Sequence, residues 1–213
     1  WGTYEEKFAQ LRLLYAFMYS HPGKKLLFMG GEFGQFVEWR YAEQLDWCRE
    51  EYEAHQKKWK YSAELGHFSQ DRRSVYEIER ELGGEWKGFK WLKAEDASNS
   101  ILAYMRMSKD QKEEILVALN FTPVAREKYT IGVPEAGDYK VIFNSNAAKY
   151  GGDGKISKRI FSAVRKPAHG KQYSISIDMP KMTCLYLERE PEEPKAVKTT
   201  AKRAKPAAGT TKA

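Results

Sequence analysis

A short apolar run that ends in a glycine-rich turn constrains the first third of the chain. Leu26–Met29 stands between two lysines and a segment with three glycines in five residues. Such a run is typical of a strand buried on both faces, and such strands are usually parallel and covered by helices. Because glycine permits tight turns, we expect Glu32 and Gln35 to follow at the carboxyl end of the strand. Glu32 then either faces a substrate cleft or holds the turn by accepting backbone N–H bonds.

Helical patterns lie on both sides of this run. Thr3 and Glu6 stand at the spacing of a capping box, and apolar residues then recur at helical intervals, which predicts a helix over residues 4–20. A second helical stripe covers residues 56–82, with an interruption near Gly66. A helix followed by a buried strand is an α/β unit. One helix and one strand cannot close a barrel, so we expect their apolar faces to have no partner inside this chain.

From residue 89 onward the pattern changes to short runs of β-forming residues separated by turn residues. The expected strands are residues 89–92, 100–107, 114–121, 128–133, 139–144, 159–164, 172–177 and 182–187. Eight short strands at this spacing predict an antiparallel sandwich. We expect this all-β part to be the stable unit, and the exposed apolar faces of residues 4–30 to promote aggregation.

Composition and charge separate the body of the chain from its end. The formal net charge is +7, but six basic residues and no acid lie in residues 194–213, so the remainder is nearly neutral. Residues 190–213 hold mainly Pro, Ala, Lys and Thr, which predicts a disordered basic tail. A nucleic-acid-binding body would show a basic face of its own, so nucleic acid is not a favoured partner. No apolar run has the length of a membrane span.

Four motifs together carry a resemblance to a known family: Phe28–Gln35, Glu38-Trp39, Leu45–Trp47 and Asn120–Val124. Over about residues 1–190, the chain resembles the C-terminal portion of bacterial glycogen branching enzymes, which belong to the α-amylase superfamily. The resemblance implies an α/β plus all-β fold. Residues 1–85 would be the last helix–strand–helix segment of a (β/α)₈ barrel, residues 86–189 an antiparallel β-sandwich domain, and residues 190–213 an added tail.

The resemblance also implies a reaction. Branching enzymes cleave an α-1,4 bond of a glucan and transfer the chain to a glucose O6, which forms an α-1,6 branch. The family's three catalytic carboxylates lie on earlier barrel strands, so we assign no catalytic residue here and expect the chain alone to be inactive. The enzyme needs no cofactor, and no metal site is expected. The expected partners are an α-glucan and the upstream barrel, and the expected location is the cytoplasm.

An aromatic and acidic loop over residues 36–56 supplies the remaining candidate glucan contacts. Aromatic faces stack on sugar rings and carboxylates accept sugar hydroxyls, so Trp39, Asp46 and Trp47 join Glu32 and Gln35 as expected substrate-binding residues. Alternatively, the two tryptophans simply cover the core.

Two other functions stay open, namely a non-catalytic glucan-binding β-domain and a nucleic-acid binder that acts through its tail. Cys48 and Cys184 are expected to be reduced thiols, although a single disulfide is also possible.

Overall fold

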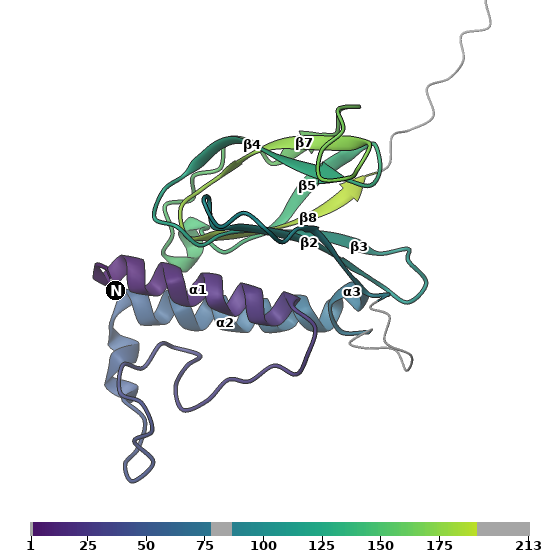
Figure 1. Cartoon of the computed structure of the whole chain (residues 1–213). Coiled ribbons are helices and arrows are strands. Elements are labelled where there is room, and N and C mark those ends of the chain that lie inside the picture. The colour runs from purple at the N-terminus through teal and green to yellow at the C-terminus, as the bar shows by residue number, and fades with distance from the viewer. Residues whose placement is uncertain (1, 78–86, 191–213) are drawn as a thin grey trace, which may run out of the picture.

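A layer of helices packs against a β-sandwich in the computed structural model, which describes residues 2–77 and 87–190 (Figure 1). The helical layer contains α1 (Tyr4–Ser20), the 3₁₀ helix η1 (Trp47–Glu51), α2 (Glu53–Asp71) and the short α3 (Arg73–Tyr76). Helices α1 and α2 lie side by side beneath the larger sheet (Figure 1). The expected tail and the end of the second helical stripe lie outside the described residues.

All eight expected strands are present, and every pairing between them is antiparallel. The strands are β1 (Phe89–Lys93), β2 (Ile101–Met107), β3 (Glu114–Asn120), β4 (Arg126–Val133), β5 (Asp138–Asn144), β6 (Ile160–Ser162), β7 (Tyr173–Met179) and β8 (Thr183–Glu190). Six of them form one sheet in the order β1-β2-β3-β8-β5-β6, and β4 pairs with β7 in a second sheet. The prediction of an antiparallel all-β part is therefore confirmed.

The larger sheet is buried on both faces. Along β3, Val117 and Leu119 belong to a core shared with α1 and α2, whereas Leu116 and Ala118 belong to a core shared with β4 and β7. Alternate residues of a strand point to opposite faces, so a strand covered on both sides must be apolar at nearly every position. This explains why the segment 114–120 reads as an almost continuous apolar run.

The capping box of α1 forms as predicted, with the Thr3 hydroxyl and the Glu6 carboxylate each accepting the other residue's backbone N–H. The expectation that this helix would find no partner is wrong. Leu13 and Ala16 enter the core beneath the six-stranded sheet. The partner of this helix is the face of the six-stranded sheet that points away from β4 and β7, and the sequence did not reveal it.

The expected strand at residues 26–29 does not form, and this segment is loop. Leu26 is 72% exposed and Phe28 is 52% exposed. A strand exists only when its backbone pairs with a neighbour, and no neighbouring strand reaches this segment within the described residues. The break expected near Gly66 is also absent, because α2 continues through it. The loop after the turn is shorter than predicted, since η1 begins at Trp47.

A buried arginine joins the helical layer to the sheet. Arg106, on β2, is fully buried and donates to three backbone carbonyls that lie in separate segments. Its nitrogens reach Ser20 O at the end of α1 (2.7 Å), Val75 O in α3 (2.8 Å) and Gly88 O before β1 (3.2 Å). A guanidinium is suited to this role because its five N–H donors are fixed in one plane.

Replacing this arginine should destabilise the whole chain. Arg106→Met keeps most of the side-chain volume but leaves three buried carbonyls without a donor, so we expect the free energy of unfolding to fall by about 3–5 kcal/mol in urea titrations. Arg165→Met is the matched control, because Arg165 is exposed and should change stability by less than about 0.5 kcal/mol. Equal effects of the two substitutions would contradict this role.

Candidate functional site

The glycine-rich turn is held in place by one face of α2. Gly30 and Gly34 adopt φ values of 82° and 81°, and Gly34 N donates to Gly30 O at 2.9 Å. From α2, His55 Nδ1 lies 2.8 Å from Phe33 O, and Ser62 Oγ donates to Glu32 O at 2.8 Å. Three successive turn carbonyls, at residues 31–33, are thus bound by side chains of α2.

Lys58 is the central member of this group. Its ammonium donates to Gly31 O and Glu32 O, each at 3.3 Å, and to Ser62 Oγ at 2.6 Å. The same nitrogen lies 3.9 Å from the ring centroid of Tyr15. Burial, with a smaller contribution from Arg12, lowers the pKa of Lys58 from 10.5 to about 7, and the nearby Glu32 opposes the change. The turn is therefore anchored by a lysine that can lose its charge near neutral pH.

Two of the predicted site residues stabilise the loop itself. Gln35 Oε1 accepts from Asp46 N and Gln35 Nε2 donates to Val37 O, each at 2.9 Å, so both ends of the amide are bound within the loop. The Asp46 carboxylate lies 3.9 Å from Arg49 Nε. Glu32 is half-buried, and it is its backbone carbonyl that α2 holds.

The two tryptophans lie in different surroundings. The Trp47 ring packs against Phe33 and Trp59, with centroid distances of 5.5 and 6.3 Å, and the side chain is 44% exposed. This position favours the core-covering interpretation for Trp47. Trp39 is 71% exposed and contacts Phe28 at a centroid distance of 5.1 Å. The structure thus brings Gln35, Asp46 and Trp47 together. Trp39 lies apart from them, in the loop between the glycine-rich turn and η1.

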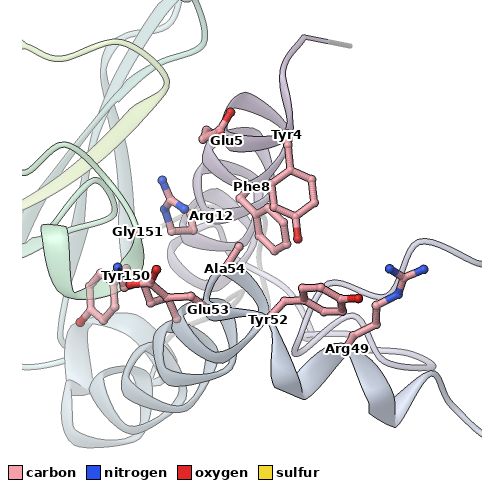
Figure 2. Close-up of a pocket in the computed structure, with 11 residues that line it drawn as sticks. Tyr4, Glu5, Phe8, Arg12, Arg49, Tyr52, Glu53, Ala54, Tyr150 and Gly151 are labelled. Carbon is pink, nitrogen blue, oxygen red and sulfur yellow. Dashed lines mark ion pairs between the residues drawn. The ribbon is translucent and has the colours of Figure 1, made fainter.

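A pocket of about 530 Å³ opens near the N-terminal ends of α1 and α2 (Figure 2). Its walls combine aromatic and basic side chains from α1, from η1 and the start of α2, and from η2 (Ala148–Tyr150). The charged and aromatic residues that line it include Tyr4, Arg12, Arg49, Tyr52, Glu53 and Lys57. Sequence reasoning missed this pocket because three segments far apart in the chain form it.

Three further observations concern the described residues only. No helix among them is long and apolar enough to cross a membrane. No group of three or more His, Cys, Asp or Glu side chains in residues 2–77 and 87–190 is arranged to hold a metal ion. Both cysteines are free, Cys48 at the surface and Cys184 in the core.

The low pKa of Lys58 should make stability depend on pH. Between about pH 7 and pH 10.5 the unfolded chain keeps the lysine proton and the folded chain does not, so the lysine makes stability rise with pH. Relative to Lys58→Met, the unsubstituted protein should gain about 1.4 kcal/mol per pH unit between roughly pH 8 and pH 10. Lys60→Met, which removes an exposed lysine of the same helix, should leave this slope unchanged. Parallel stability curves for the protein and Lys58→Met would show that Lys58 titrates normally.

Comparison with known proteins gives the family. Residues 91–190 match the family described as alpha amylase, C-terminal all-beta domain. The chain is 43% identical over 187 residues to the 1,4-alpha-glucan branching enzyme of Halothermothrix orenii, covering 88% of this chain and 29% of that enzyme. It is 40% identical to the branching enzyme of Bacillus caldolyticus, covering 84% of this chain and 26% of that enzyme. The chain thus spans less than a third of the length of these relatives.

Solved structures share the fold at low sequence identity. AmyP in complex with maltose is 13% identical with a TM-score of 0.52, over 85% of this chain and 35% of that one. Ttha1563 from Thermus thermophilus is 12% identical with a TM-score of 0.54, over 85% of this chain and 31% of that one. These likenesses concern the fold alone. The sequence matches place residues 91–190 in the family of alpha-amylase C-terminal all-beta domains, within a chain that is homologous to the C-terminal region of 1,4-alpha-glucan branching enzymes.

Proposed function

We propose that this chain serves as the C-terminal portion of a 1,4-alpha-glucan branching enzyme, which cleaves α-1,4 bonds and forms α-1,6 branches. The observation that carries the proposal is the identity of 40–43% over most of this chain to enzymes of that name. In this proposal α1, the loop after it and α2 are the last part of the catalytic barrel, and the β-sandwich packs against that barrel from outside.

The exposed loop supports a barrel partner. Residues 24–28 form no ladder, and their side chains alternate between exposed and half-buried positions, as those of a strand do. Leu26, Phe28 and Phe36 leave apolar surface open to solvent. A preceding barrel strand would supply the missing backbone pairing, and barrel side chains would cover these residues. The proposed partner is therefore the upstream barrel of the parent enzyme.

The proposed chemistry assigns this chain a supporting role. A retaining transglycosylation needs a carboxylate nucleophile and a carboxylic acid about 5 Å apart, and in this proposal both lie upstream. Glu32, Gln35, Trp39, Asp46 and Trp47 would line the rim of the cleft as glucan contacts. Trp39 is the best supported of these, since its exposed ring offers a face for a sugar to stack on. A cytoplasmic location remains a prediction, as does the absence of a cofactor.

A chimera tests the proposal directly. The region of the Halothermothrix orenii enzyme that matches this chain is replaced by residues 1–190, and branching of amylose is followed by the shift of its iodine absorption. We expect the chimera to branch amylose, because the transplanted region supplies the loop, α2 and the sandwich on which the barrel packs. The isolated chain should produce no shift. Branching by the isolated chain, or a folded chimera without activity, would refute the proposal.

A second candidate function is glucan binding by the chain itself, and the exposed pair Trp39 and Phe28 favours it. The chain should then be retarded in a native gel that contains glycogen. Trp39→Ala should lower the affinity about tenfold, since an exposed aromatic anchor would be lost. Trp47→Ala should instead reduce the free energy of unfolding by about 1–2 kcal/mol, because its ring packs on Phe33 and Trp59. Unretarded migration at high glycogen would exclude this candidate.

Binding of nucleic acid through the basic tail ranks last. The tail lies outside the described residues, and the body of the chain is nearly neutral.

A further inference from the structure

The pocket near the starts of α1 and α2 contains a buried guanidinium with unused donors. Arg12 is only 3% exposed and lines the pocket (Figure 2). Its Nε donates to Ser145 O at 2.9 Å. Its two terminal nitrogens have no hydrogen-bond or ion-pair partner among the described residues, although Asp153 is close enough to act on it electrostatically. Guanidinium donors that are not bonded to the protein can bind an acceptor in the pocket, and hydrogen bonds to a charged donor are the stronger kind, so a ligand that accepts them would be favoured.

The N-terminus of α2 adds a second set of donors to the same pocket. This 19-residue helix has Tyr52 at its N-cap position, and no side chain caps it. Glu53 and Ala54, the first two residues of the helix, line the pocket. The free N–H groups of a helix N-terminus and the helix dipole together favour an anion.

Basic side chains outnumber acidic ones among the residues that line the pocket, with Arg12, Arg49 and Lys57 against Glu5 and Glu53. Glu53 is paired with Lys57 at 2.5 Å, so these two side chains largely cancel. Arg49 contributes a second guanidinium, whose Nε is buried without a hydrogen bond. Its carboxylate neighbour, Asp46, lies 3.9 Å from that nitrogen. Glu5 is the remaining acid among the lining residues, and it lies exposed on the first turn of α1. Asp153, outside the lining, also acts on Arg12 electrostatically.

Aromatic side chains give the pocket room for more than a bare ion. Tyr4 is 40% exposed and Tyr52 is 55% exposed, and both line the pocket (Figure 2). Their rings present apolar faces next to the donors, which is the usual composition of a small-molecule site. A volume of about 530 Å³ also exceeds what one phosphate would fill.

We propose that this pocket binds a small organic anion, with its phosphate or carboxylate group at Arg12 and the N-terminus of α2 and its uncharged body against Tyr4 and Tyr52. The pocket adjoins the loop that follows the glycine-rich turn, since the Tyr4 ring lies 5.9 Å from that of Phe36 and Arg49 lies 3.9 Å from Asp46. The proposal does not depend on the proposed branching activity, because anion binding to the chain is measured without any glucan.

Calorimetric titration of the purified full chain tests the proposal. The probes are glucose 6-phosphate, gluconate and glucose, which share a similar body and differ in the charged group. We expect one or both anions to bind at millimolar concentrations or below, with an affinity that falls as salt is added, and glucose not to bind. The stronger of the two anions identifies the charged group as phosphate or carboxylate.

Substitutions then locate the site. Arg12→Gln should weaken anion binding by about tenfold or more, since hydrogen bonds from a charged group are lost. Arg49→Gln, which leaves the bond to Ser145 intact, should weaken it by about threefold or more and serves as the test if Arg12→Gln does not fold. Lys181→Gln, with the same charge change in the exposed turn between β7 and β8, should bind as the unsubstituted chain does. Absence of anion binding, equal binding of glucose, or binding that neither arginine substitution weakens would overturn the proposal.

Discussion

The structure depends on one constraint: the six-stranded sheet is apolar on both faces and needs a cover on each. In β3 and β8 the residues alternate between two cores, with Val117 and Tyr186 on one side and Leu116 and Leu187 on the other. Strands β4 and β7 cover one face, and α1 and α2 cover the other (Figure 1). The hydrophobic effect scales with the apolar area removed from water, so neither cover can be removed cheaply. The helical segment is thus a part of the core.

The same packing places the candidate site. Because one side of α2 is fixed against the sheet through Tyr61 and Leu65, its other residues form a rigid support for the glycine-rich turn. Lys58 and Ser62 hold the carbonyls of that turn, and beyond it the loop has few anchors within the described residues. A fixed turn followed by an exposed apolar loop is the arrangement expected where another part of a barrel completes the fold. This arrangement links the geometry of the chain to the proposed role in a branching enzyme.

Features set by local sequence could be predicted, and features set by distant partners could not. The capping box at Thr3 and Glu6 and the turn residues between the β-runs are local signals, so α1 and the eight strands were correctly predicted. The run at residues 26–29 has the composition of a strand, but strand formation also needs a neighbour with which to pair. The packing of α1 on the sheet was missed for a related reason: an apolar stripe does not say which surface it will meet. The pocket around Arg12 combines three segments, and no local pattern joins them. The roles of Glu32 and Trp39 in glucan binding stay predictions.

Native-state amide hydrogen exchange of the full chain tests the shared core most directly. If α1 and α2 are the cover that the sheet requires, their slowest amides should open with the same free energy as those of β3 and β8, and that value should equal the free energy of global unfolding. The loop between the turn and η1 should exchange at much lower free energy. Helices that exchange well before the sheet, while β3 and β8 keep full protection, would show that the sandwich is stable without them and would contradict the account.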